Sequence, residues 1–255
     1  MRTARISIPG MAGIVEAEAA DGGRTLVLGG RSVARDRVAF EPAADGLVYG
    51  ILLNDEGSLQ ALGEKLNEAP YKAPPKAPVL YIKPWNTHLG HGGTVALPHG
   101  AQHLEVLGAL GIVFGAQATR VDEAHALTCI RGYTVVADLS LPQASLYRPP
   151  IREKCFDGSC PIGPWVVGRD ALGDPADLEV LVHINGALRQ RRSLRKLLRT
   201  VPRLIAEVTA FLTLYPGDVL LAGVPLAAPT ARAGDRIAVE IPGIGRLEND
   251  IVASQ

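Results

Sequence analysis

The sequence predicts a β-rich α+β fold, and three features of the chain support this prediction. Short apolar, β-branched runs recur along the 255 residues, as in Val79–Ile82 and Tyr133–Ala137. Few segments have the spacing of an apolar helix face. Glycine (28 residues) and proline (19 residues) interrupt the chain often. Many short strands, few helices and frequent Gly/Pro turns are typical of such a domain.

The first 74 residues are expected to form a small N-terminal β/α region. Apolar stretches on either side of Asp21–Gly23 predict a β-hairpin within residues 1–45. The pattern VYGILLND then predicts a strand, and a stiff proline-containing connection follows at residues 70–76. We therefore expect a boundary at residue 74, with the larger domain spanning residues 75–255.

Helical spacing is confined to a few places. SLQALGEKLNEAP predicts a helix, with Ser58 as a plausible cap. The segment VDEAHAL reads as a short helix start. Pro202 stands at the preferred first position of another helix. The apolar face of that helix is expected to comprise Leu204, Ile205, Val208, Phe211 and Leu212.

A basic run follows the predicted strand Leu178–Ile184, which Asn185–Gly186 turns. A nucleic-acid patch is one interpretation, but no aromatic residue is interleaved and the formal net charge is zero. A solvated helix face is the favoured interpretation. The run comprises Arg189, Arg191, Arg192, Arg195, Lys196, Arg199 and Arg203.

A carboxylate stands at the end of the apolar strand Tyr133–Ala137. A buried, unpaired carboxylate costs several kcal/mol or takes up a proton, so Asp138 needs a metal, a cation or a proton. A proline-rich cationic segment follows, which suggests a shaped loop and a pocket for an anionic small molecule. The alternative is an ordinary strand followed by a solvated charged loop. The cations are Arg148, Arg152 and Lys154, with Arg131 more distant.

The segment Lys83–Gly93 is rich in glycine and histidine. Its glycines permit a tight, irregular path that could bring backbone amides towards a ligand. It is not a dinucleotide-binding fingerprint, because no helix start follows it. His91 and His88 could move protons near a site, since imidazole titrates near neutrality. Surface histidines on a flexible loop are the alternative.

Bulk composition argues against several classes of function. A content of 47% hydrophobic and 20% charged residues fits a globular protein. Because the formal net charge is zero, no overall electrostatic attraction to nucleic acid or anionic lipid is expected. No apolar run approaches the ~18 residues of a membrane span, and the N-terminus lacks a secretory-signal pattern, so we expect a cytoplasmic protein. Cys129, Cys155 and Cys160 read as free thiols rather than zinc ligands.

Five motifs occur in a fixed order: GYTVVADLS, KCFDGSCPIGPWVV, HINGALRQ, LYPGDVLLAGVP and PGIGRLEN. This order resembles that of the fumarylacetoacetate hydrolase family, over about residues 46–253. The resemblance implies a mixed β-sandwich roll behind a small N-terminal domain, and an oligomer. Two further segments, PYKAPPKAPVLYIKPWNTHLG and SLYRPPIREKCFDGSCPIG, are most similar to one branch. That branch comprises the N-terminal half, or separate N-terminal subunit, of the 4-hydroxyphenylacetate-degradation bifunctional isomerase/decarboxylase.

Two of the three carboxylates of the family's metal site are missing from this sequence. Members with a complete site carry Glu-x-Glu where this chain has Leu107 and Ala109, so Asp138 is the only ligand retained. One carboxylate does not hold Mg²⁺. Glu105 does not replace the missing pair, because it lies two positions before Leu107, ~7 Å along the strand. We expect no tightly bound metal here, and Mg²⁺ or Mn²⁺ in a sister subunit. Val224, where the family has threonine, is a second sign of an altered site.

The resemblance implies an enzyme of 4-hydroxyphenylacetate (homoprotocatechuate) catabolism. The expected reactions are decarboxylation of 5-oxopent-3-ene-1,2,5-tricarboxylate and isomerisation of 2-hydroxyhepta-2,4-diene-1,7-dioate. One alternative is a catalytically weak structural partner of a metal-bearing sister subunit. Another is an acylpyruvate-type C–C hydrolase, which the missing Glu pair disfavours. The expected partners are a small di- or tricarboxylate substrate and either a second copy or a homologous subunit.

Seven residues are expected at the site. Lys154, which matches the family's KxFD motif, is the predicted electrophile at the 2-oxo group. Asp138 would orient Lys154, hold a residual metal or act as a base, and His91 is the third predicted catalytic residue. The predicted substrate-binding residues, of which the two arginines could clamp carboxylates bidentately, are Arg148, Arg152, Lys83 and Gln190.

Overall fold

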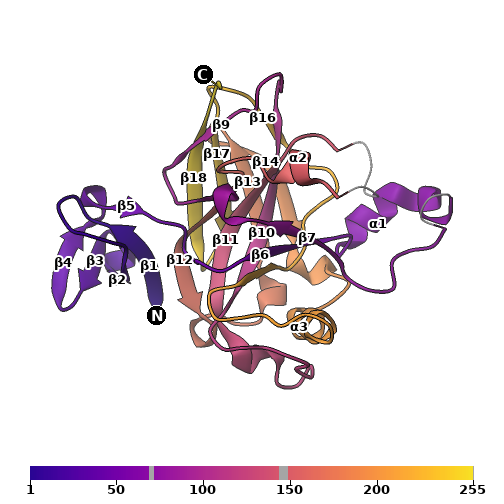
Figure 1. Cartoon of the computed structure of the whole chain (residues 1–255), viewed down its shortest axis with the longest axis horizontal. Helices are drawn as coiled ribbons and strands as arrows, with labels where there is room; N and C mark the ends of the chain where they lie inside the picture. The colour runs from indigo at the N-terminus through magenta and orange to yellow at the C-terminus, as the bar shows by residue number, and fades with distance from the viewer. Residues whose placement is uncertain (69–71, 144–148, 255) are drawn as a thin grey trace.

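The structure is a computed structural model that describes residues 1–68, 72–143 and 149–254. Its strands form a large sheet that runs through the body of the molecule and a smaller sheet of five strands. The N-terminal strands stand apart from the body as a lobe at one end (Figure 1).

The N-terminal lobe is an antiparallel meander in the order β4-β3-β2-β1. Strand β1 connects the lobe to the body, because it pairs with β12 with Arg2 opposite Val167. The expected turn at Asp21–Gly23 is present between β2 and β3, so the predicted hairpin is one part of a larger meander. The strands are β1 (Arg2–Ser7), β2 (Val15–Ala20), β3 (Thr25–Leu28), β4 (Arg31–Ala34) and β5 (Ala39–Phe40).

Two long strands lie at the centre of the large sheet, β10 (Leu104–Phe114) and β11 (Ile130–Ser140), and they pair antiparallel. The sheet continues in the order β12-β11-β10-β15-β6-β7. Strands β6 and β7 pair directly although the predicted boundary at residue 74 falls between them; the division into domains stays a prediction. The remaining strands are β6 (Val48–Leu52), β7 (Val79–Lys83), β8 (His88–Leu89), β12 (Cys160–Gly168), β15 (Val219–Leu221) and β16 (Thr230–Ala231).

The five-stranded sheet has the order β14-β13-β17-β18-β9. Its strand β18 packs beside β12, the strand to which the N-terminal lobe is joined, and the sheet contributes to the main core (Figure 1). Its strands are β9 (Thr94–Ala96), β13 (Glu179–Ile184), β14 (Ala187–Ser193), β17 (Arg236–Ile241) and β18 (Gly245–Val252).

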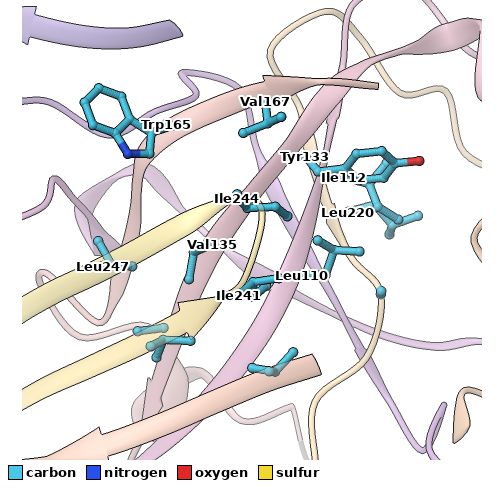
Figure 2. Close-up of a cluster of buried hydrophobic side chains, with 14 of the residues drawn as sticks. Leu110, Ile112, Tyr133, Val135, Trp165, Val167, Leu220, Ile241, Ile244 and Leu247 are labelled. Atoms are coloured by element: carbon cyan, nitrogen blue, oxygen red, sulfur yellow. The ribbon is translucent and has the colours of Figure 1, made fainter. Parts of the chain in front are cut away.

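The central strands β10 and β11 are buried on both faces. Leu110 and Val135 point to the core shared with the five-stranded sheet, where they join Ile241 in one cluster (Figure 2). Because successive side chains on a strand alternate, Leu107 and Asp138 lie on the opposite face. That second face is where the candidate site forms.

The α-helices are few and short. Asp55, rather than the predicted Ser58, caps α1, because its carboxylate accepts a hydrogen bond from the Ser58 backbone N–H. Pro202 is the second residue of α3, one position later than predicted, after the cap Thr200 and Val201. No helix in the described part of the chain is long and apolar enough to cross a membrane. The α-helices are α1 (Glu56–Leu62), α2 (Ile151–Lys154) and α3 (Val201–Thr209).

Short 3-10 turns connect many of these elements. One of them, together with a turn, replaces the helix start predicted from VDEAHAL. They are η1 (Asp21–Gly23), η2 (Arg35–Arg37), η3 (Gly63–Asn67), η4 (Trp85–Thr87), η5 (Ala126–Cys129), η6 (Arg169–Ala171), η7 (Pro175–Asp177) and η8 (Leu194–Lys196).

The basic run is the clearest departure from the sequence predictions about the fold. Its first part is the strand β14, which returns antiparallel to β13 after the Asn185–Gly186 turn, so the predicted helix face was wrong there. Phe211, assigned to the apolar face of the next helix, lies beyond α3 and is 67% exposed. The β-rich α+β class itself is confirmed.

Candidate active site

Asp138 lies at the centre of a buried polar cluster. It is near the end of β11, directly opposite Leu107 of β10, and its side chain is fully buried. Its carboxylate contacts two lysines and a tyrosine, and we call the four residues the lysine–aspartate cluster: Lys83, Asp138, Lys154 and Tyr81. The sequence required a metal, a cation or a proton at Asp138, and the structure supplies cations.

Lys83, the last residue of β7, is buried against Asp138, with Nζ 2.9 Å from Oδ1. Its Nζ donates hydrogen bonds to Leu139 O (3.0 Å), Ser159 Oγ (3.1 Å) and Lys154 O. An ammonium group has three N–H donors, and all three are used in this way. Within the described residues, Oδ1 of Asp138 is therefore paired by charge but accepts no hydrogen bond. Lys83 thus ties β7 to β11 and to the end of α2.

Lys154 is the last residue of α2, and its ammonium group reaches the other oxygen of Asp138. Its Nζ donates to Asp138 Oδ2 and to Ser140 Oγ, both at 2.7 Å. Tyr81 donates its phenolic hydrogen to the same Oδ2 (2.6 Å), and Lys154 Nζ lies over its ring, 4.4 Å from the centroid. Gly50 makes room for this ring, since a Cβ there would come within 1.9 Å of Tyr81 Cζ.

Two lysines share one carboxylate, so the lysine–aspartate cluster has an excess of positive charge. Burial alone would raise the pKa of Asp138, but the charges of Lys154 and Lys83 and the hydrogen bonds from Lys154 and Tyr81 hold it at about 2. Burial lowers the pKa of Lys154, against the opposing effect of Asp138. Burial and the Asp138 charge raise the pKa of Tyr81 well above its ordinary value, so Tyr81 remains a donor. A fixed cation in a dry site can stabilise an oxyanion.

A small pocket of about 60 Å³ opens beside the cluster. Typical small-molecule sites have roughly 300–1,000 Å³, so this pocket is small for a whole substrate. A larger hollow of about 630 Å³ lies around Tyr133 and Pro202, but it shares no lining residue with the lysine–aspartate cluster. The side chains around the small pocket include Lys154, Ser140, Glu105, Leu107, Val224 and Leu226.

Arg192 of β14 supports the pocket wall at residues 223–226, and the sequence interpretation missed it. Its Nη2 donates to Gly223 O (2.9 Å) and to Gly108 O (3.1 Å), and its Nη1 lies 3.6 Å from Asp55 Oδ2. Ser58, next to this cap of α1, accepts a hydrogen bond from Leu226 N (3.0 Å). The network holds β10, α1 and this wall together. The signal was the Asn–Gly turn, which makes the following residues a strand with alternating sides.

Comparison with known proteins identifies the family. A family model described as fumarylacetoacetate (FAA) hydrolase C-terminal matches residues 47–252. The chain belongs to the fumarylacetoacetate hydrolase family. A Salmonella dublin protein named 4-hydroxyphenylacetate degradation bifunctional isomerase/decarboxylase is 35% identical over 239 residues, which cover 91% of this chain and 55% of that protein. The chain spans about half the length of this relative and of two Escherichia coli bifunctional isomerase/decarboxylases.

Solved structures from the family share the whole fold. A Mycobacterium smegmatis 5-carboxymethyl-2-hydroxymuconate delta-isomerase superposes with a TM-score of 0.85 at 30% identity, and the match covers 100% of both chains. A Mycobacterium marinum 2-hydroxyhepta-2,4-diene-1,7-dioate isomerase superposes with a TM-score of 0.82 at 28% identity, covering 100% of this chain and 99% of that one. The predicted family and fold are confirmed.

The structure brings together three of the predicted site residues, Lys83, Asp138 and Lys154. The other predicted residues that the structure describes lie elsewhere. Gln190 donates to Ala227 O (2.9 Å), just beyond the wall at residues 223–226. Arg152 is exposed on α2, and Arg148 lies outside the described residues. The roles assigned to these residues stay predictions.

His91 lies in a separate hollow with residues of the N-terminal lobe. Its Nδ1 accepts a hydrogen bond from Glu248 N (3.1 Å), and its Nε2 lies 2.9 Å from Arg35 Nη2. Its ring meets that of Phe40 edge-on at 5.3 Å. Burial, together with the charge of Arg35, lowers the pKa of His91 to about 4. His91 thus joins the lobe to β18 and, among the described residues, is not part of the pocket beside Lys154.

The donor set at Asp138 does not fit a divalent metal. Leu107 and Ala109, where the family's metal-binding members carry the Glu pair, are buried on the same face of β10 as Asp138 on β11. Both oxygens of Asp138 are within 3 Å of an ammonium nitrogen, which repels a cation. No group of three or more His, Cys, Asp or Glu side chains comes together in the described ranges.

Titration calorimetry of the purified chain with Mg²⁺ or Mn²⁺ is expected to detect no stoichiometric site of micromolar affinity or tighter. The physical reason is the excess positive charge around Asp138 and the hydrocarbon side chains at the two neighbouring positions. The variant Leu107→Glu with Ala109→Glu places two carboxylates on the face of Asp138 and is expected to gain affinity. A single tight site in the unmodified chain would contradict this prediction.

Proposed function

We propose that this chain is an isomerase that converts 2-hydroxyhepta-2,4-diene-1,7-dioate into its 2-oxo-3-ene tautomer. The observation that carries the proposal is the ammonium group of Lys154, fixed by Asp138 and Ser140 at the wall of a pocket. The two solved relatives whose names state an isomerase activity support the same class of reaction.

The proposed role of Lys154 is to stabilise the oxygen at C2 of the substrate as it becomes anionic. Ketonisation of a dienol moves a proton from the C2 hydroxyl to C5, and the oxygen carries negative charge between the two transfers. A preorganised cation that interacts more strongly with the charged oxygen than with the neutral hydroxyl lowers the activation barrier of the reaction. Asp138 orients the ammonium group and stays ionised, because its pKa is about 2.

Decarboxylation makes a larger demand on the site. The electron pair released with CO₂ must flow into a conjugated 2-oxo group, for which a metal ion is a stronger acceptor than one ammonium group. The Salmonella dublin relative is named for both activities, and this chain spans about half of it. We propose that decarboxylation requires a metal-bearing homologous subunit, with which this chain associates as two copies of one fold do.

The test is an assay of the purified chain alone and then mixed with such a homologous subunit. We expect conversion of the dienol by this chain alone, and CO₂ release from the tricarboxylate only in the mixture and only without a chelator. Rapid, chelator-insensitive CO₂ release by the chain alone would overturn the division of labour. No conversion of the dienol under any condition would favour the structural-partner alternative. The small pocket and the apolar Leu107 and Ala109 are consistent with that alternative.

A further inference from the structure

The proposed isomerisation needs a group that takes the proton from the C2 hydroxyl and delivers it to C5. Asp138 is unsuited, since the pKa of about 2 makes it a weak base and both its oxygens face lysines. Tyr81 directs its hydroxyl at Asp138, and its pKa is raised well above the ordinary value. His91 lies in a different hollow. None of these three residues is therefore suited to this task.

Glu105 lines the same small pocket as Lys154. It is the second residue of β10 and stands directly opposite Ser140 of β11. Side chains opposite each other on paired strands lie on the same face, with Cβ atoms about 5 Å apart. Ser140 Oγ in turn accepts the hydrogen bond from Lys154 Nζ. Glu105 and Lys154 therefore line one pocket from neighbouring positions.

The surroundings of Glu105 make it a better proton carrier than an exposed carboxyl. Burial raises the pKa of Glu105, and Asp138 on β11 adds to this effect. Lys154 on α2 and His103, just before β10, act in the opposite direction, but the net shift is upward. A base is most effective when the pKa of its conjugate acid approaches the working pH, so the shift is in the useful direction.

We propose that Glu105 is the catalytic acid–base of the isomerisation, an inference that rests on the proposed function. The Glu105 carboxylate accepts the proton from the C2 hydroxyl while Lys154 holds the oxygen. The C2–O bond becomes a carbonyl. The C2=C3 and C4=C5 double bonds are replaced by one C3=C4 double bond, and the carboxylic acid of Glu105 protonates C5. One O–H bond is broken and one C–H bond is formed, with no change in oxidation state. The carboxyl returns to its starting form.

The test compares the full-length chain with its Glu105→Gln variant, using the dienol as the probe. Glutamine keeps the shape but transfers no proton, so we expect the rate to fall by about 100- to 10,000-fold. The matched control is Glu18→Gln, the same change at an exposed position of β2, which is expected to leave the rate unchanged. Glu105→Asp keeps the carboxyl and is expected to retain more activity than Glu105→Gln.

The pH profile separates a catalytic role from a structural one. In the unmodified chain, kcat/KM should rise with pH as Glu105 ionises, and this acid limb should be absent in Glu105→Gln. A uniform loss of rate with an unchanged acid limb, or full activity of Glu105→Gln, would overturn the assignment while leaving the isomerase proposal intact. An inactive unmodified chain would overturn both. If Glu105→Gln does not fold, a shifted acid limb in Glu105→Asp supports the assignment, and an unshifted one refutes it.

Discussion

Replacing Lys154 with methionine is expected to lower the rate of isomerisation by about 100- to 1,000-fold, the usual effect of removing one donor to a developing oxyanion. Methionine keeps the length and apolar character of the side chain but not the charge. The loss should appear in kcat more than in KM, because the ammonium group acts on charge that develops in the transition state. Steady-state kinetics with the dienol measures both quantities.

The fold should survive this change, although Lys154 is buried. Asp138 keeps the Lys83 ion pair and the Tyr81 hydrogen bond, so the remaining charges balance. We expect the free energy of unfolding to change by about 1 kcal/mol. Lys196→Met, at an exposed position of η8, is the control and should leave kinetics unchanged. Equal rates for Lys154→Met and the unmodified chain would show that Lys154 serves only the structure.

The sequence predicted the carboxylate but not everything that pairs with it. Asp138 at the end of an apolar strand had to meet a cation, a metal or a proton, and it meets cations. Lys154 was predicted from its match to the family's KxFD motif. The contact with Lys83, 55 positions earlier, depends on how β7 and β11 come to lie near each other. Local sequence patterns do not predict a contact between residues so far apart in the chain. The role of Gly50 in seating Tyr81 depends on the same long-range pairing.

Local patterns give no indication of some of the tertiary contacts that the structure shows. A histidine in a glycine-rich loop suggests a mobile proton carrier, but His91 packs against Arg35 and Phe40 from the N-terminal lobe, which the family resemblance did not clearly cover. The basic run has helical spacing in part, yet the Asn–Gly turn before it requires a returning strand. On that strand Arg192 points inward to Gly108 and Gly223, whereas the exposed Arg191 pairs with the half-buried Glu179.

Replacing Asp138 with asparagine is expected to be the most destabilising of these changes. It leaves the ammonium groups of Lys83 and Lys154 buried without a counter-ion, and breaking a buried pair in this way costs about 3–5 kcal/mol. Urea unfolding of the variant measures the loss. The control Asp250→Asn removes the partner of Arg236 in an exposed ion pair and should cost far less.

The double variant Asp138→Asn with Lys154→Met tests the cause of that loss. It removes one of the two stranded cations, so it should be more stable than Asp138→Asn alone, and the two changes should be strongly non-additive.

The dependence of stability on pH gives a second check. Because the pKa of Asp138 is lowered from 3.8 to about 2, its contribution is fully present above pH 3.8 and is lost as the pH falls towards 2. The difference in stability between the unmodified chain and Asp138→Asn should therefore shrink by on the order of 2 kcal/mol across that range. A difference that stays constant down to pH 2 would mean that asparagine disrupts packing, and that the ion pairs with Lys83 and Lys154 contribute little to holding the site together.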